Sequence, residues 1–259
     1  MTLCSSLLSF CRKSPVPLAV ALLLPAPLKA NDAAIGAPKA GVEYWETRHE
    51  AYSERAQEGN IGLLFLGDSI TEGWKGQEQI WREFWGEHDA VNFGISGDLT
   101  QHVVWRIEHG ELDGANPEVL VLMIGTNNTG VHSAAQIIGA NRRIVELIRE
   151  KLPETRIVLC ALLPRGPWVR RGVLDKWEAR MEVIAEVNPG LAQIAAEDEM
   201  ITWLDMTPAF STPEGLANGD LYSDWLHLNS AGYQVWAAQL APVVASLKSS
   251  SAVPAGSWE

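Results

Sequence analysis

The sequence is short of cysteine, of basic residues and of long apolar runs, and each shortage excludes a class of protein. Three of the 259 residues are cysteine, and 20 Lys and Arg stand against 32 Asp and Glu. The formal net charge of −12 gives no electrostatic footprint for nucleic acid or for an anionic membrane. No apolar run is long enough for a permanent membrane-spanning helix. The hydrophobic content of 47% is, however, ample for the core of one globular domain.

The first thirty residues have the pattern of a secretory signal peptide. Arg12 and Lys13 precede an apolar stretch over 16–28, and Ala30 closes it before a polar pair. We expect residues 1–30 to be removed on export to the periplasm or the extracellular medium. The alternatives are an uncleaved membrane anchor and a disordered tail. Residues 31–42 are then expected to be a linker, 43–248 the folded domain and 249–259 a tail.

Removal of residues 1–30 would leave an acidic chain with a single cysteine. It takes away three positive charges and no negative ones, so the formal charge moves from −12 to −15. Cys160 alone remains, so no intramolecular disulfide can form. Because Cys160 lies in an apolar run, we expect an inert buried thiol rather than a nucleophile. No stable association with a membrane is expected after cleavage.

Short apolar runs alternate with helical patterns along the rest of the chain, which predicts an α/β fold. Continuous apolar runs suit strands buried on both faces, and the alternation predicts a parallel sheet of about five strands in a three-layer α/β/α sandwich. Capping sequences at 98–101, with Asp98 as the cap, and at 133–136 begin two helices. A helix over 173–199 is expected to break near 188–190, and a last helix starts at Ser230. The strand runs are 61–66, 90–93, 119–124, 156–163 and 201–204.

The first of these runs is followed by Ser69, a candidate nucleophile. Ligands of such folds bind beyond the carboxyl ends of the strands, and a serine there has its backbone N–H at the start of a helix. A hydroxyl and an N–H in that place suit a group that attacks a carbonyl and stabilises an oxyanion. The alternative is a plain helix cap, because Glu72 three residues later completes a capping box with Ser69.

The next two strand ends offer hydrogen-bond donors to the same edge. Gly97 lies in a glycine-containing turn whose N–H can donate to an oxyanion, and Asn127 can donate through its side-chain amide. Each has an ordinary alternative, a chain turn for Gly97 and a polar turn for Asn127.

A candidate base stands just before the last helix. Asp224 precedes His227 by three residues, so its carboxylate can accept the imidazole N–H and fix the tautomer. The alternatives are a surface pair or two metal ligands. None of the other five histidines forms an H-x-x-x-H or Cys/His cluster with His227, so we predict no metal and no cofactor.

At these residues the chain resembles the SGNH (GDSL) hydrolase family. The matching blocks are 67–70 (GDSI), Gly97, 125–128 (GTNN) and the Asp224-x-x-His227 pair, and the resemblance covers roughly residues 44–247. It is most similar to the branch of the catalytic subunits of platelet-activating-factor acetylhydrolase. Ser96 replaces the glycine usual in that branch, and a signal peptide is not expected of those intracellular enzymes.

The resemblance implies a flavodoxin-like SGNH hydrolase fold and a serine esterase. Its catalytic residues would be Ser69, Asp224 and His227, and its oxyanion donors Ser69, Gly97 and Asn127. The substrate contacts that the resemblance implies are Ile70, Thr126, Trp225 and Leu226.

Three kinds of function remain open from the sequence. A short-chain, acetyl-type ester is the expected substrate, from a glycan or another small molecule. A lipid or small-ester acylhydrolase is the alternative within the esterases, and a non-catalytic module that binds glycans or partner proteins is the alternative outside them. A metal-dependent phosphoesterase is disfavoured by the missing ligand cluster. The resemblance leaves a homodimer open, since dimers occur in that branch.

Overall fold

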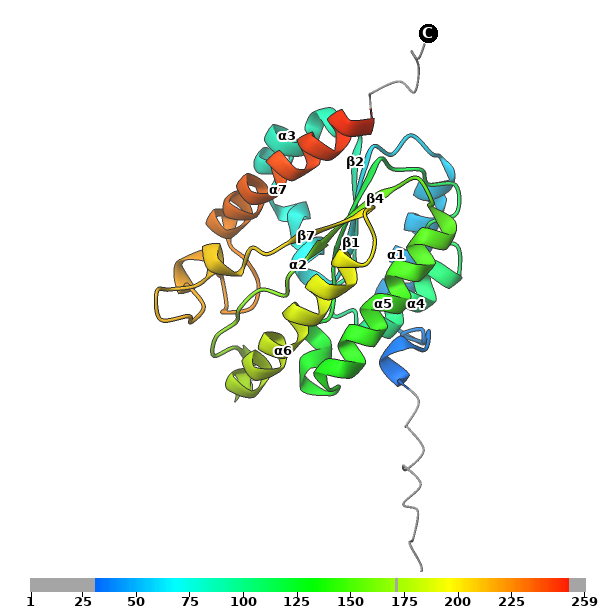
Figure 1. The fold of residues 1–259 in the computed structure, drawn as a ribbon. Helices are drawn as coiled ribbons and strands as arrows, with labels where there is room; N and C mark the ends of the chain where they lie inside the picture. The colour runs from blue at the N-terminus through cyan, green and yellow to red at the C-terminus, as the bar shows by residue number, and fades with distance from the viewer. Residues whose placement is uncertain (1–30, 171, 252–259) are drawn as a thin grey trace, which may run out of the picture. The chain divides into compact units, whose positions relative to one another are not determined.

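A computed structural model describes residues 31–170 and 172–251, which contain a five-stranded parallel sheet between two layers of helices (Figure 1). The strand order is β2-β1-β3-β4-β7. The predicted signal peptide lies outside the described residues. The strands are β1 (Leu63–Gly67), β2 (Ala90–Gly94), β3 (Val119–Met123), β4 (Arg156–Cys160) and β7 (Ile201–Leu204).

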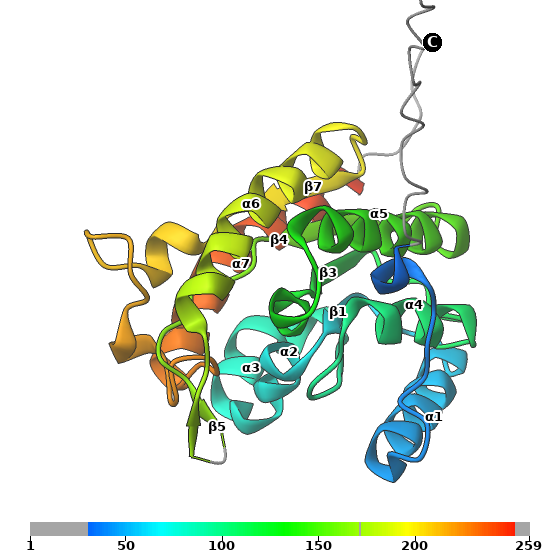
Figure 2. The ribbon, with the colours of Figure 1, turned by 90° about the horizontal axis from the view of Figure 1, so that it is seen from below.

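Alternate side chains of the sheet enter two separate cores, which confirms the predicted three layers. Leu64 and Leu66 of β1 pack with α1, α4, α5 and α6, whereas Leu63 and Phe65 pack with α3 and α7. Figures 1 and 2 show these two helical layers on opposite sides of the sheet. The helices are α1 (Glu43–Gln57), α2 (Ser69–Glu72), α3 (Glu78–Trp85), α4 (Thr100–Glu108), α5 (Ala134–Lys151), α6 (Trp177–Ala196) and α7 (Ser230–Ser251).

One of the two predicted helix caps is confirmed. Ser133 caps α5 by accepting a hydrogen bond from Gln136 N, and the Gln136 side chain accepts one from Ser133 N at 3.0 Å. The prediction of Asp98 as a cap is wrong, because α4 begins after Leu99. The carboxylate of Asp98 is engaged elsewhere, as described below.

The predicted break in the helix over 173–199 is also wrong. Pro189 lies inside a continuous α6, and the side chain of Asn188 bonds the backbone N and O of Leu162 at 2.9 and 3.0 Å. A Cβ at Gly190 would lie 2.4 Å from the Ile138 side chain, so this glycine serves close packing with α5 rather than a turn. The first residues of the range form a small hairpin instead, from β5 (Val169–Arg170) and β6 (Val173–Leu174).

The structure corrects both ends of the predicted domain. The predicted linker packs on the domain: a 3-10 helix, η1 (Asp32–Ala34), contacts α5, and Ala33 is fully buried. Asn31 Nδ2 donates to the carbonyl of Gln136 at 2.9 Å. At the other end α7 continues past residue 248, the predicted end of the domain, to Ser251.

Two further observations concern the membrane and the thiol. Within residues 31–170 and 172–251 no helix has the length and apolar character that crossing a bilayer requires. Cys160 is fully buried in the sheet, and burial raises the pKa of its thiol to about 12. It is therefore the inert thiol that the sequence predicts.

Candidate active site

The turn after β1 carries Ser69 at the carboxyl edge of the sheet. Asp68 is the N-cap of α2, and its Oδ1 accepts a hydrogen bond from Ile70 N at 3.0 Å. The alternative reading of Ser69 as the helix cap is therefore wrong. Asp68 is only 1% exposed, and this burial raises the pKa of its carboxyl to about 7, against the opposing bond from Ile70.

The loop before α7 brings His227 to the same edge. His227 Nε2 lies 3.0 Å from Ser69 Oγ, although 158 positions separate the two residues. On the other side of the ring, Nδ1 lies 2.8 Å from Asp224 Oδ2. The three predicted residues thus form one hydrogen-bonded series, serine to imidazole to carboxylate.

Asp224 is fixed by more than the imidazole. Its Oδ1 accepts bonds from the backbone N of Leu226 and of His227 at 3.1 and 2.7 Å, and its Oδ2 accepts one from Trp168 Nε1 at 3.0 Å. Partial burial opposes ionisation, but the bonds from His227 and Leu226 outweigh it and lower the pKa of Asp224. A carboxylate held in this way orients the imidazole and can stabilise its charged form.

The predicted oxyanion donors lie on two neighbouring loops. Gly97 has a φ of +71°, a left-handed conformation that favours glycine. Asn127 Nδ2 donates to the carbonyl of Asp98 at 2.9 Å and to Asp68 Oδ2 at 3.3 Å. The first bond ties the Asn127 amide to the Gly97 loop. The longer bond, to Asp68 Oδ2, would be replaced by a bond to the oxyanion if the Asn127 amide served as an oxyanion donor.

Side chains from outside the sheet hold the loop Ser96–Asp98, which we call the Gly97 loop. Glu72 of α2 accepts bonds from Ser96 N at 2.9 Å and from Ser96 Oγ. Lys39 Nζ donates to the carbonyl of Ser96 at 2.9 Å and pairs with Asp98 Oδ1 at 2.8 Å. Burial opposes the charge on Glu72, but the bonds from Ser96, Tyr44 and Lys75 lower its pKa.

A buried cluster of ion pairs also holds the Gly97 loop in place. Arg106 of α4 is fully buried and pairs with Asp98 and with Glu111. Trp45 Nε1 donates to Asp98 Oδ1 at 2.8 Å, and His49 Nδ1 lies 3.2 Å from Glu111. Burial alone would lower the pKa of Arg106, but its two carboxylate partners raise it, so the guanidinium stays charged.

The four predicted substrate contacts differ in exposure. Ile70, Thr126 and Leu226 are 3%, 4% and 4% exposed, whereas Trp225 is 41% exposed. Ile70 belongs to the core beneath α3 and α7. Of the four, only Trp225 presents a large side-chain surface to solvent.

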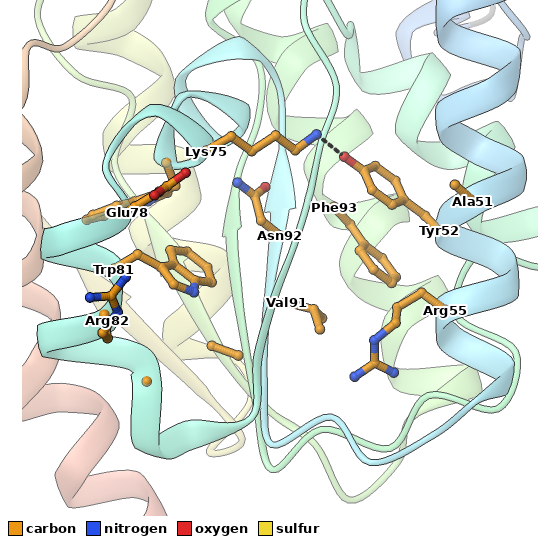
Figure 3. Close-up of a pocket in the computed structure, with 13 residues that line it drawn as sticks. Ala51, Tyr52, Arg55, Lys75, Glu78, Trp81, Arg82, Val91, Asn92 and Phe93 are labelled. Atoms are coloured by element: carbon orange, nitrogen blue, oxygen red, sulfur yellow. Dashed lines mark hydrogen bonds between the residues drawn. The ribbon is translucent and has the colours of Figure 1, made fainter.

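A cavity of about 640 Å³ lies away from this series, between α1, α3 and β2 (Figure 3). Its walls include Tyr52, Phe93 and Trp81, and Lys75 Nζ donates to the Tyr52 hydroxyl at 2.7 Å. None of Ser69, Asp224 and His227 lines it. Size alone therefore does not identify the site, because the hydrogen-bonded series of Ser69, His227 and Asp224 lies at the carboxyl edge of the sheet instead.

Most of the supporting side chains could not be predicted from the sequence. Lys39 falls in the predicted linker, and Glu72 enters the sequence pattern only as part of a cap for Ser69. Arg106 did carry a signal, since it is a charged residue among the apolar positions of a helix. Nothing in the sequence indicates that the indole N–H of Trp168 donates to Asp224.

Among the residues that the structure describes, no three His, Cys, Asp or Glu side chains lie together in a way that could hold a metal ion.

Comparisons with known proteins agree on one family. The model of the "GDSL-like Lipase/Acylhydrolase family" matches residues 65–235. The human platelet-activating factor acetylhydrolase IB subunit alpha1 is 36% identical over 73% of this chain and 78% of its own length. A GDSL-like lipase from Bacteroides thetaiotaomicron aligns with a TM-score of 0.61 at 20% identity, over 76% of this chain and 97% of that one. A carbohydrate esterase family 3 protein from Talaromyces cellulolyticus aligns with a TM-score of 0.53 at 19% identity, over 73% and 99%.

Proposed function

The chain belongs to the GDSL-like lipase/acylhydrolase family and hydrolyses ester bonds, and from this premise we propose that it is a serine esterase for short-chain, acetyl-type esters. Ser69 is the nucleophile, His227 the general base and Asp224 the residue that orients the base. One observation carries the proposal. The imidazole of His227 lies between the other two side chains, with Nε2 3.0 Å from Ser69 Oγ and Nδ1 2.8 Å from Asp224 Oδ2. Hydrogen-bond contact between nucleophile, base and orienting acid is the arrangement that nucleophilic acyl transfer needs.

The first half of the reaction forms an acyl-enzyme. As Ser69 Oγ bonds to the ester carbonyl carbon, its proton passes to His227 Nε2. The carbonyl oxygen becomes an oxyanion, for which the donors are the backbone N–H groups of Ser69 and Gly97 and the amide of Asn127. Each such donor is worth about 3–4 kcal/mol of transition-state stabilisation. His227 then protonates the leaving alcohol.

The second half releases the acid. His227 takes a proton from water, whose oxygen attacks the acyl carbonyl, and the same donors hold the second oxyanion. The ester bond to Ser69 breaks, and His227 returns the proton to Ser69 Oγ. Asp224 keeps its negative charge throughout and stabilises the imidazolium that forms twice.

Burial around the nucleophile favours a short acyl group. Ile70 and Leu226, the apolar neighbours of Ser69 and His227 in the chain, expose only 3% and 4% of their surface. An acyl chain of many carbons needs accessible apolar surface to replace water, and these two side chains offer very little. An acetyl group needs almost none.

A lipid ester is the second candidate for the alcohol side of the substrate. The 36% identity to a platelet-activating factor acetylhydrolase subunit favours it, whereas the carbohydrate esterase supports the common fold alone. We propose further that the protein is exported, because Arg12 and Lys13 precede an apolar stretch that ends at Ala30.

Hydrolysis of p-nitrophenyl acetate, butyrate and octanoate by residues 31–259 tests the proposal. Wild type is expected to prefer acetate, and Ser69→Ala should reduce kcat by a factor of about 10³ or more with an unchanged melting temperature. Ser133→Ala is the matched control, since it removes a serine that caps a helix outside the site. A fluorophosphonate should label wild type on Ser69 alone.

Turnover by Ser69→Ala at the wild-type rate would exclude Ser69 as the nucleophile. A preference for octanoate would contradict the short acyl group but leave the esterase mechanism intact.

A further inference from the structure

An exposed tryptophan lies between the proposed base and its orienting acid. Trp225 is 41% exposed, whereas Trp45, Trp74, Trp85 and Trp236 are at most 1% exposed. Its φ of +69° is rare for a bulky residue. The position thus holds a large apolar side chain in an unfavourable backbone conformation without burying it in a core.

Two glycines fix the indole in place. A Cβ at Gly166 would lie 2.6 Å from Trp225 Cε3, and a Cβ at Gly219 would lie 2.5 Å from Trp225 Cη2. The six-membered ring therefore packs directly against two stretches of backbone, and Gly166 N also donates to the Trp225 carbonyl at 2.9 Å. We call Trp225 with Gly166 and Gly219 the Trp225 platform. Because these contacts already restrict the indole, little side-chain freedom is lost when a ligand packs on it.

Two polar residues stand beside the platform in the chain. Asp220 follows Gly219, and Ser223 precedes Asp224; both side chains are exposed. The loop that contains Gly219 and Trp225 (orange in Figure 2) lies beside the segment that leads to β5, and Trp168 Nε1 connects the two by its bond to Asp224 Oδ2. An apolar ring surface with carboxylate and hydroxyl groups near it suits a ligand with apolar faces and a polar rim.

A pyranose ring has this form, with C–H groups on its faces and hydroxyls around its edge. We propose that the Trp225 platform is a subsite for a pyranose ring of an O-acetylated glycan, the alcohol part of the ester that Ser69 cleaves. The inference rests on the proposed function and chooses between its two alcohol candidates. A rigid ring loses no internal rotations on an open surface, whereas an alkyl chain would lose several there.

The test compares two acetyl esters that differ in the alcohol. The first is an acetylated methyl β-D-xylopyranoside, and the second is ethyl acetate, which has no ring. For Trp225→Ala, the ratio of kcat/KM for the sugar ester to that for ethyl acetate should fall about tenfold, mainly through KM. Trp225→Phe should restore most of the ratio. Leu216→Ala, which removes another exposed apolar residue of the same loop region, should leave it unchanged.

An unchanged ratio in Trp225→Ala would overturn the subsite. So would a larger loss on a short-chain phospholipid ester than on the sugar ester, which would assign the platform to a lipid. Calorimetry with unacetylated xylotetraose separates this inference from the proposed mechanism, because Ser69→Ala should still bind and Ser69→Ala/Trp225→Ala should not. If wild type bound xylotetraose but hydrolysed neither ester, the proposed esterase activity would be refuted and the proposed subsite would stand.

Discussion

At the scale of single residues, Asp68 serves the site at a cost to the fold. Its Oδ1 accepts from Ile70 N and its Oδ2 from Asn127 Nδ2, so it fixes both the turn that carries Ser69 and a proposed oxyanion donor. The same carboxyl is 1% exposed, and burial raises its pKa from 3.8 to about 7. The folded state therefore binds the proton of Asp68 more tightly than the unfolded state does.

This shift predicts a pH dependence of stability. Because the folded pKa is raised, the contribution of Asp68 is fully present below pH 4 and is lost as the pH rises to about 7. Between pH 5 and pH 8, wild type should lose about 3 kcal/mol of unfolding free energy relative to Asp68→Asn. Urea denaturation at the two pH values measures the difference. Asp113→Asn, at an exposed aspartate, is the control, and parallel pH profiles for wild type and Asp68→Asn would contradict the prediction.

The proposed catalytic residues could be singled out from the sequence because each stands near a feature that the sequence shows. Ser69, Gly97 and Asn127 lie shortly after the ends of apolar runs, and Asp224 and His227 are three residues apart. The conformation of Trp225 could not be predicted, since its positive φ depends on contacts with Gly166 and Gly219 that come from other loops. The role of Asp68, rather than Ser69, as the cap of α2 could not be predicted either.

At the scale of elements, the Gly97 loop is held from three directions. Glu72 comes from α2, Arg106 from α4 and Lys39 from the segment before α1. A donor of an oxyanion hole is effective only when it is held in position before the reaction. We therefore regard Lys39 as a positioning residue for Gly97.

Replacement of Lys39 tests this role. Lys39→Met removes the bond to the Ser96 carbonyl and the pair with Asp98, so kcat should fall about tenfold while KM changes little. Lys39→Arg should recover part of the loss. Lys151→Met, which removes a surface ion pair with Asp113, is the control. A lower melting temperature with wild-type kcat would show that Lys39 only stabilises the fold.

The sequence predicted the five strands of the sheet closely, but not the start of α4 or the continuity of α6. A Pro-Gly pair usually ends a helix, yet α6 passes through it because the Asn188 side chain bonds the Leu162 backbone and Gly190 packs on Ile138. Likewise Asp98 does not cap α4, and its carboxylate instead pairs with Arg106. In both cases tertiary partners distant in the sequence override the local pattern.

At the scale of the whole molecule, the topology assembles the site. With all five strands parallel, the loops after β1, β2 and β3 meet at one edge, and the loop before α7 reaches the same place. This arrangement of loops could be predicted from the alternation of strands and helices. The packing of residues 31–42 on the domain could not be predicted, because a segment rich in Ala, Gly and Pro gives no indication of what it contacts.

That packing restricts where a signal peptide can be cut. Asn31 bonds the Gln136 carbonyl and Ala33 is fully buried, so cleavage after Ala33 would remove residues that the domain uses. We expect the exported protein to begin at Asn31, which mass spectrometry of protein from the culture medium or periplasm would measure. Ala30→Leu should slow this processing. A mature chain that starts beyond Lys39 would contradict the expectation.

Lys39 lies near the start of the proposed exported chain, and this position has a practical consequence. Loss of the first ten residues by a trimming protease would leave serine, histidine and aspartate in place but would remove the ammonium group beneath the Ser96 carbonyl. Preparations with ragged amino termini would then differ in specific activity while titrating with the same number of reactive serines. An active-site titration would count every molecule with a reactive serine, whereas the measured rate would come mainly from the molecules that retain Lys39.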